Sequence, residues 1–368
     1  MDATITFKPH SPSPLRTLAS PPRELLVQSL THLTTEWPPE KAAQDTQPRM
    51  GFFQGPTSIA YLFFHLSKTH PQLEISGETA TAWFELYFYW SALEAPREEE
   101  GSEQGIGIAS EHFCHLALRA AHTQDASHFL SAVANTTLTS VQDLLVGSAG
   151  LLFLLRFVRF HVPLSAPLLS AQIARVIAHI TATPSPWLFH GRAYTGAAHG
   201  DIGIITQICL SSPGSAALVK DALSALLDAQ LENGNWYSTR DRGHEHLQWC
   251  HGAAGITLSL NTLKPFFPDD PMKSRIQAAV EKAQRLIFEK GVLVKEPCLC
   301  HGVMGNALAL EGGWREHLLS FATPEEMEGA TWEKSSDPMG LFCGEAGRAW
   351  VWAMVDAGDE GFPAYTNF

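Results

Sequence analysis

The chain has 368 residues, of which 45% are hydrophobic and 17% charged, and its 38 acidic and 25 basic side chains give a formal net charge of −13. This apolar share supports a large buried core, which excludes a disordered chain. The acidic balance offers no basic face to phosphate backbones or anionic lipid, so nucleic acid is excluded as a partner.

The first 24 residues are rich in proline, so we expect a tail (1–24) that lies on the protein or stays mobile, followed by a single domain over residues 25–368. The opening sequence lacks the apolar core of a signal peptide, and no apolar run reaches the roughly 18 residues of a membrane span. These features favour a cytoplasmic protein whose six cysteines remain thiols or bind a metal. Segments 95–105, 266–271 and 323–340 indicate exposed connections.

A glycine pattern recurs seven times along the chain, each time as Gly-x-x-Gly or Gly-x-x-Ser followed by an apolar run. The copies begin at Gly55, Gly107, Gly147, Gly200, Gly252, Gly302 and Gly344. Their spacings of 40 to 53 residues leave room for two helices and two loops in each repeat. Because glycine allows sharp turns and close backbone approach, we expect each copy to mark the start of a helix.

The two helices of a repeat differ in their apolar pattern. Segment 274–290 places apolar residues among charged ones at helical spacing, which is typical of a solvent-facing amphipathic helix. The runs after the glycines, such as LLFLL and IITQICL, are apolar on all sides and indicate buried helices. We therefore predict an all-α fold, an α/α barrel (toroid) of seven helix pairs with inner and outer rings. Its seven inner helix starts would line one bowl.

Two repeats open with the same tripeptide, Cys250-His251-Gly252 and Cys300-His301-Gly302, which places two Cys-His pairs at neighbouring helix starts. Thiolates combined with imidazole favour zinc. The residues alone allow a closed Cys2His2 structural site, or an open site with three protein ligands and one position for substrate. Alternatively, both cysteines are small buried apolar residues that bind no metal.

Four segments carry a resemblance to a known family, namely GAAHGDIGI at 196–204, WCHGAAGI at 249–256, CHGVMGNALAL at 300–310 and FCGEAG at 342–347. They resemble the lanthionine synthetase C (LanC) family. With the terminal GFPAYTNF, they are more similar to its eukaryotic LanC-like branch than to bacterial lantibiotic cyclases. The resemblance extends from about Gly51 to the C-terminus. It implies a double ring of seven helices with a central zinc, in agreement with the repeat count.

The resemblance implies that Cys250, Cys300 and His301 are the zinc ligands, which would leave the fourth position open. In the bacterial cyclases a zinc-bound cysteine thiolate of the peptide adds to dehydroalanine or dehydrobutyrine and forms a thioether. Eukaryotic members are implied to add glutathione to dehydroamino acids, some after eliminating phosphate from phosphoserine or phosphothreonine. The addition also needs an acid to protonate the enolate that it forms.

Three further residues match site positions of the family. His199 occupies its acid/base position, and an imidazole suits proton transfer at neutral pH. Asp143 matches the carboxylate that works with this histidine. His251 stands where LanC-like relatives carry histidine, and we assign it to the site but not to the metal. Each has an alternative interpretation. His199 could be a core histidine whose hydrogen bonds are satisfied, Asp143 could cap a helix, and His251 could only support a metal ligand.

Other residues have less specific interpretations. Lys295 matches a lysine implied to contact the carboxylate of glutathione, or it is a solvated charge. Arg348 could bind a carboxylate or phosphate through its forked guanidinium, or it forms a structural ion pair. Bacterial cyclases carry an arginine at the position of His246, which we read as part of a polar loop. Cys298 is read as a free thiol and Cys343 as a wall residue.

The leading interpretation is a zinc enzyme that activates a thiol, glutathione or a peptide thiol, for conjugate addition. Its electrophile would be a dehydroamino-acid-containing peptide, a phosphorylated peptide or a small electrophile. The alternative is a non-catalytic zinc-containing module that binds glutathione or a partner, as a redox sensor or regulator. Alkylation of a zinc thiolate, as in protein prenyltransferases, is disfavoured because their site combines an aspartate with cysteine and histidine. We expect a monomer, since no heptad seam or apolar patch stands out.

Overall fold

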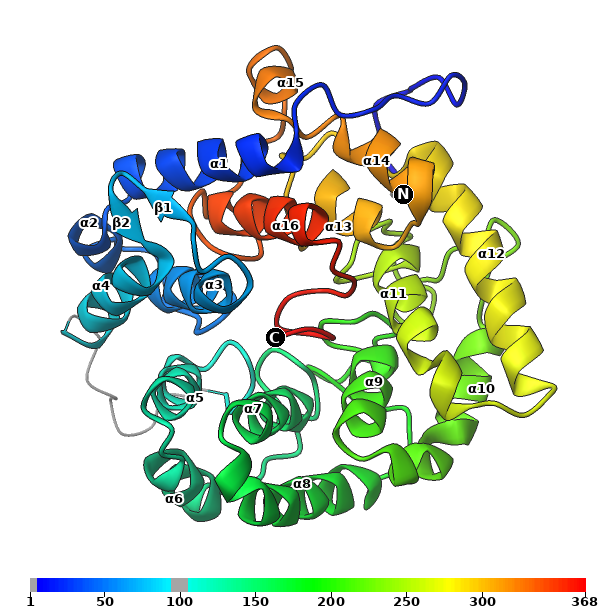
Figure 1. Cartoon of the computed structure of the whole chain (residues 1–368). Helices are drawn as coiled ribbons and strands as arrows, with labels where there is room; N and C mark the ends of the chain where they lie inside the picture. Colours follow the sequence, from blue (N-terminus) through cyan, green and yellow to red (C-terminus); the bar gives the residue numbers. More distant parts are fainter. Residues whose placement is uncertain (1–4, 94–104) are drawn as a thin grey trace.

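Helices dominate the computed structural model, which describes residues 5–93 and 105–368 (Figure 1). Most of the helices in these residues form two concentric rings around a common centre. Strands within the same residues are limited to one short antiparallel hairpin, β1 (Glu74–Ile75) and β2 (Glu78–Thr79). The predicted all-α barrel of seven helix pairs is therefore confirmed.

The inner ring consists of helices that are largely buried, and each begins at or just after one copy of the glycine motif. They are α3 (Pro56–Thr69), α5 (Glu111–Thr123), α7 (Ser148–His161), α9 (Asp201–Ser211), α11 (Ala253–Leu263), α13 (Val303–Leu308) and α16 (Glu345–Ala357).

The outer ring covers the inner one with seven amphipathic or mixed helices. They are α1 (Pro22–Glu36), α4 (Ala80–Leu93), α6 (Ser127–Asn135), α8 (Ala166–Thr181), α10 (Lys220–Asp228), α12 (Met272–Lys290) and α14 (Gly312–Leu319). Each packs on the inner helix before it, except that α1 packs on the last inner helix, α16. The two ends of the chain therefore close the ring (Figure 1).

Short helices complete the connections between the rings. Two are α-helical and three are 3-10 turns, namely α2 (Pro39–Ala43), α15 (Pro324–Glu328), η1 (Pro163–Ser165), η2 (Pro213–Val219) and η3 (Lys264–Phe266). The amphipathic pattern of 274–290 lies in α12, whose predicted face is buried at Ile276, Val280, Ala283 and Ile287.

A closed ring of seven backbone hydrogen bonds ties the inner helix starts together. In each bond an amide donates to a carbonyl of the adjacent repeat, and the last bond returns to the first repeat. The bonds, with N–O distances in Å, are Phe52 to Ile108 (2.9), Ile108 to Leu144 (3.2), Leu144 to Ala198 (3.1), Ala198 to Cys250 (3.4), Cys250 to Cys300 (3.2), Cys300 to Phe342 (2.8) and Phe342 to Phe53 (3.1). This ring fixes the register of every repeat against its neighbours.

The second glycine of the motif is required by close backbone contact. A Cβ atom at this glycine would lie only 1.9 to 2.1 Å from a backbone carbonyl oxygen. This holds for Gly150, Gly203, Gly255, Gly305 and Gly347. The first glycine is the N-cap of six inner helices. The expectation is wrong for Gly107, because α5 begins after Ser110, whose hydroxyl accepts from the Phe113 amide.

The C-terminal segment fills the centre of the ring (Figure 1). The carbonyl oxygen of Tyr365 accepts from Arg156 Nη2 at 2.9 Å and from Gln207 Nε2 at 2.8 Å, and all three residues are buried. The Phe362 ring stacks on Trp249 with 4.7 Å between ring centres. Protein side chains therefore occupy the lumen beneath the ring of backbone hydrogen bonds.

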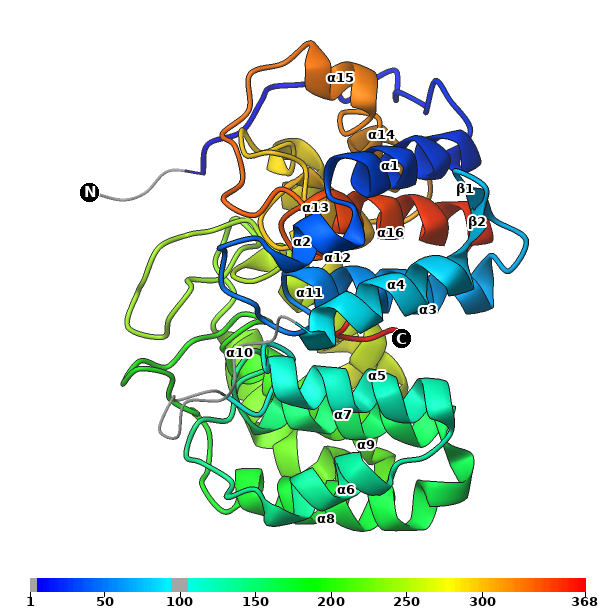
Figure 2. The same cartoon turned by 90° about the vertical axis from the view of Figure 1, so that its left-hand side faces the viewer.

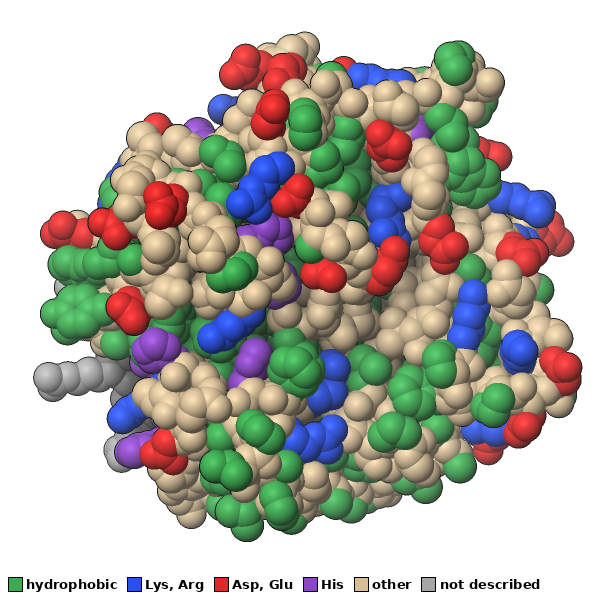
Figure 3. Space-filling view, in the orientation of Figure 1, with side chains coloured by type: hydrophobic (Ala, Val, Ile, Leu, Met, Phe, Trp, Pro, Cys, Tyr) green, Lys and Arg blue, Asp and Glu red, His purple; other side chains and the backbone are tan. Residues whose placement is uncertain are grey.

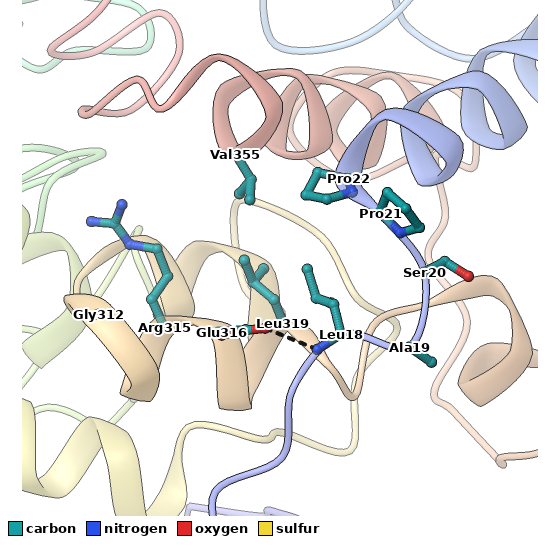
Figure 4. Close-up of a pocket in the computed structure, with 10 residues that line it drawn as sticks. All are labelled: Leu18, Ala19, Ser20, Pro21, Pro22, Gly312, Arg315, Glu316, Leu319 and Val355. Atoms are coloured by element: carbon teal, nitrogen blue, oxygen red, sulfur yellow. Dashed lines mark hydrogen bonds between the residues drawn. The ribbon is translucent and has the colours of Figure 1, made fainter.

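The described part of the N-terminal segment runs over the outside of the barrel. The Lys8 amide donates to the Val292 carbonyl at 2.7 Å, and Arg16 forms an ion pair with Glu326. Farther along, residues 18–22 border a groove of about 540 Å³ against α14 and the end of α16 (Figure 4). This groove lies between the N-terminal segment and the barrel.

The expected boundaries of the tail and loops shift slightly in the structure. Helix α1 begins at Pro22, inside the segment 1–24 that we expected to be a tail. The connection expected at 95–105 lies outside the described residues except for Gly105. The one at 323–340 contains the short helix α15.

The two ends of the barrel differ in their connections. Loops that lead from outer to inner helices gather on the left in Figure 2, and the shorter turns from inner to outer helices lie on the right. Figure 3 views the end with the short turns, where acidic, basic and apolar side chains are mixed. No single described helix is long and apolar enough to cross a membrane, and α7 with Pro163–Thr181 reaches that extent only across a 119° bend.

Replacing Gly150 by alanine tests the role of the second glycine. Its Cβ would lie 2.0 Å from the Leu144 carbonyl oxygen and 2.5 Å from Gly107 Cα, so backbone atoms of two repeats would have to move. We expect the free energy of unfolding of Gly150→Ala to fall by about 2–4 kcal/mol. Gly214→Ala is the matched control because a Cβ there meets no atom within 4 Å, and it should change stability by less than about 1 kcal/mol. Equal losses in denaturant unfolding would contradict this role.

Acid should destabilise the fold through buried histidines. Burial lowers the pKa of His65 from 6.5 to about 4, and its Nδ1 donates to the Phe368 carbonyl at 2.7 Å. Because the unfolded chain then binds more protons between pH 6.5 and 4, stability falls as pH falls through this window, by about 3 kcal/mol at most for this group. His65→Gln should flatten the dependence measured by unfolding, whereas exposed His128→Gln should not. An unchanged slope in His65→Gln would contradict the assignment.

Candidate functional site

Sulfur and imidazole donors converge at the starts of three neighbouring inner helices. Cys300 and His301 precede α13 and Cys343 precedes α16, and their donor atoms all lie within 4.8 Å of one another. Cys250, just before α11, lies near enough to the Cys300 thiol to affect its pKa, and its own Sγ contacts Gln248 Oε1 at 3.4 Å. We call Cys250, Cys300, His301 and Cys343 the Cys-His cluster.

The surroundings of the Cys-His cluster favour the uncharged forms of Cys300 and His301 when no cation is bound. The hydrogen bonds from Cys250 and Cys343, followed by burial, raise the pKa of Cys300 well above its usual value. Burial, and to a smaller extent the charge of Lys295, lowers the pKa of His301 from 6.5 to about 4. A divalent cation would reverse the balance for the thiols, because it binds thiolate and neutral imidazole. Thiols and one imidazole at this separation fit a tetrahedral zinc ion.

The cluster differs from the ligand set implied by the sequence in one member. The structure brings Cys300 and His301 together as expected, but Cys343 joins them in the tightest group, with Cys250 beside it. We expected Cys343 to be a wall residue. Its position in the repeat could have indicated a ligand, because Cys343 stands directly before the N-cap glycine of its helix, as His301 does in the preceding repeat. The roles of all four as ligands stay predictions.

Asp143 and His199 form a hydrogen-bonded pair at the same end of the barrel. Asp143 Oδ2 lies 2.5 Å from His199 Nδ1, and its Oδ1 accepts from the Val146 amide at 3.0 Å. The Asp143 side chain is buried, whereas the His199 side chain is 21% exposed. The Phe189 ring stacks on the imidazole at 4.1 Å. These contacts hold the ring in one orientation, and they leave Nε2 as the nitrogen that can meet a substrate.

His251 lies near this pair and is the direct chain neighbour of Cys250. Its ring centre is 6.0 Å from that of His199 and 5.4 Å from that of Tyr194. Burial, followed by the charges of His199 and His246, lowers the pKa of His251 to about 4, so its ring is neutral at neutral pH. Among the described residues, the buried Nδ1 of His251 has no hydrogen-bond partner.

Sequence reasoning missed the aromatic side chains that line this part of the site. Phe189 and Tyr194 belong to the loop between α8 and α9, which lies outside the glycine motif. No repeated pattern marks them, and only their closeness to the Ala-His-Gly segment at 198–200 could have suggested them.

Lys295 lies close to the site on the loop before α13. It borders a cavity of about 190 Å³ that is also lined by His246, Glu245 and Glu333. Its charge contributes to the lowered pKa values of His246 and His301. A cation in this position can attract an anionic group toward the Cys-His cluster.

Arg348 has a different environment from the one that substrate binding requires. Its guanidinium is buried and pairs with Glu345 at 2.7 Å and with Glu296 at 3.4 Å, and it donates to the Pro297 carbonyl at 3.0 Å. It borders a pocket on the outer side of α16, where His32 of α1 also lies. These contacts favour the structural ion pair over the role in substrate binding.

Three known proteins are similar to this chain in sequence or fold. LanC-like protein GCL1 of Arabidopsis thaliana is 32% identical over 252 residues, which cover 61% of this chain and 57% of GCL1. Glutathione S-transferase LANCL1 of Danio rerio is 29% identical over 134 residues, or 34% of this chain and 31% of LANCL1. The chain thus aligns with about half or less of the length of these curated relatives.

Among solved structures, nisin cyclase superposes with a TM-score of 0.62 over 91% of this chain and 94% of its own, at 14% sequence identity. This likeness shows the shared toroid. The family model for lanthionine synthetase C-like proteins matches residues 92–312, which is more than half of the chain. The matched segment includes the Asp143–His199 pair and three of the four residues of the Cys-His cluster. The chain belongs to the lanthionine synthetase C-like protein family.

Proposed function

We propose that this protein is a zinc-dependent LanC-like enzyme that activates a thiol for conjugate addition to a dehydroamino acid or a related electrophile, forming a thioether. The observation that carries the proposal is that the His199 ring of the Asp143–His199 pair lies 6.0 Å from the ring of His251, the residue after Cys250, and that the Ala198 amide donates to the Cys250 carbonyl at 3.4 Å. The relative named a glutathione S-transferase favours glutathione as the thiol, and a peptide thiol is the other candidate. We further propose that residues 25–368 act as one monomeric domain in the cytoplasm.

The residues of the cluster would supply a thiol-activating centre. Cys250, Cys300 and His301 would hold the zinc, which when bound supplies a positive charge that stabilises a substrate thiolate at neutral pH. Lys295 is placed to pair with a carboxylate of glutathione, and His246 stands beside it at the same cavity. Burial around the cluster excludes water, which strengthens both interactions.

His199 would carry the proton that the reaction requires. As sulfur bonds to the β-carbon of the dehydroamino acid, negative charge moves to the enolate, and the α-carbon then takes a proton. His199 would donate this proton from Nε2, because Nδ1 is held by Asp143. The thiol gives up one proton in the same turnover, so His199 returns to its starting state. The electrophile would be a dehydropeptide, a peptide whose phosphate is first eliminated, or a small molecule.

One observation favours the second candidate, a non-catalytic zinc-containing module that binds glutathione or a partner as a redox sensor or regulator. The Cys-His cluster contains four donor side chains, including Cys343, and four protein ligands are typical of structural zinc. Such a module would bind a thiol or partner without turnover. Catalytic loss in a variant that still binds thiol separates the two candidates.

His199→Asn is expected to lower turnover by about 100-fold or more, because general acid catalysis typically contributes that much. The assay follows addition of glutathione to a dehydroalanine peptide by mass spectrometry. Glutathione affinity and the free energy of unfolding should change little, because the His199 side chain is 21% exposed and its proposed role is proton transfer, not thiol binding.

His128→Asn is the matched control, since His128 lies on the exposed surface of α6. It should keep full turnover. Full turnover in His199→Asn would contradict the acid role. A wild-type protein that binds glutathione but adds it to none of a dehydropeptide, a phosphopeptide and a small enone would support the binding module instead.

A further inference from the structure

We propose that Cys343 is a fourth protein ligand, so that the metal site consists of Cys250, Cys300, His301 and Cys343. This inference rests on the proposed zinc centre and deepens it, because it names what occupies the position that a substrate thiol must take. An open site of three ligands would expose that position to solvent. In this chain the Cys343 sulfur lies within 4.8 Å of the donor atoms of Cys300 and His301.

The position of the Cys343 sulfur carries the inference. It lies within 4.8 Å of both Cys300 Sγ and a ring nitrogen of His301. Cys343 is only 7% exposed, which matches Cys300 at 7% and Cys250 at 8%. Ligands of one tetrahedral zinc ion have donor atoms roughly 4 Å apart or less, so small side-chain movements suffice to bring the donors of Cys300, His301 and Cys343 around one ion.

The backbone holds the two other cysteines more firmly than Cys343. Cys250 and Cys300 are members of the ring of backbone hydrogen bonds, and each uses both its amide and its carbonyl in it. The ring passes through Phe342 and therefore bypasses Cys343. We infer that Cys343 is the cysteine ligand that can leave, while Cys250 and Cys300 stay.

The neighbouring thiol of Cys298 is the competing candidate for a third sulfur ligand. It is fully buried and accepts from the backbone amide of His301, a contact that holds it behind the ligand residue. Cys298 also lies two residues before Cys300, on the loop side of the helix start. It therefore serves as a control for the loss of a nearby thiol.

Thiol activation would then be an exchange of ligands. Cys343 would give up its bond to the metal and take the proton of the incoming thiol, whose sulfur would bind the metal in its place. No net charge enters or leaves the buried site, which avoids the cost of an uncompensated charge there. The number of sulfur ligands stays at three throughout.

X-ray absorption at the zinc edge tests this, because it counts sulfur neighbours at about 2.3 Å without requiring turnover. The protein is loaded with one zinc per chain and measured with and without glutathione. We expect three sulfurs in the wild type and in Cys298→Ser, and two in Cys343→Ser. Glutathione should leave the wild-type count at three and raise that of Cys343→Ser from two to three.

Alkylation of the wild type gives a second readout that needs no variant. Iodoacetamide should modify Cys343 in the metal-free protein, spare it when zinc is bound, and modify it again when glutathione is added to the zinc form. A count of two sulfur neighbours at zinc in both the wild type and Cys343→Ser would overturn the proposal. Failure of the wild-type protein to take up zinc would also overturn it. Three sulfurs that fall to two in Cys343→Ser, without any response to glutathione, would keep Cys343 as a ligand and contradict only the proposed thiol activation.

Discussion

The closed ring of backbone hydrogen bonds is the constraint on which the site depends. It holds one residue of each repeat against the next and returns from Phe342 to Phe53. The Asp143–His199 pair, His251 and the Cys-His cluster consist entirely of members of this ring or their direct neighbours in the chain, namely Asp143, His199, Cys250, His251, Cys300, His301 and Cys343. Seven helix starts that are each held by two neighbours therefore place these side chains together, although they are up to 200 residues apart in the chain.

Packing on both sides of the ring keeps it in place. The second glycines let backbone carbonyls approach the inner helices to a distance that a Cβ atom would block. Below the ring, Trp249 and Phe342, which precede Cys250 and Cys343, both contact the Phe362 ring of the C-terminal segment, at 4.7 and 6.0 Å between ring centres. The C-terminus thus supports the Cys-His cluster from inside the barrel, and loss of that packing would loosen the ligands.

Much of this architecture could be predicted from the sequence, because it repeats. The glycine motif marked six of the seven inner helix starts, and it failed at α5 because Ser110 caps that helix three residues after Gly107. The motif also predicted that Cys250 and Cys300 lie together, since both occupy the same repeat position. Cys343 was missed because it stands one place later in its repeat, and the burial of Arg348 with two glutamates depends on tertiary contacts that no local pattern reveals.

Metal content together with thiol binding tests the central claim most directly, namely that the ring assembles a zinc site that receives a thiol. Zinc would be quantified in the purified wild type and in Cys300→Ala, and glutathione binding to both would be followed by calorimetry. The account predicts one zinc per wild-type chain, and loss of both zinc and glutathione binding in the variant, with its helical content retained. A wild type that holds no stoichiometric zinc, or a Cys300→Ala variant that binds glutathione as tightly as the wild type, would contradict it.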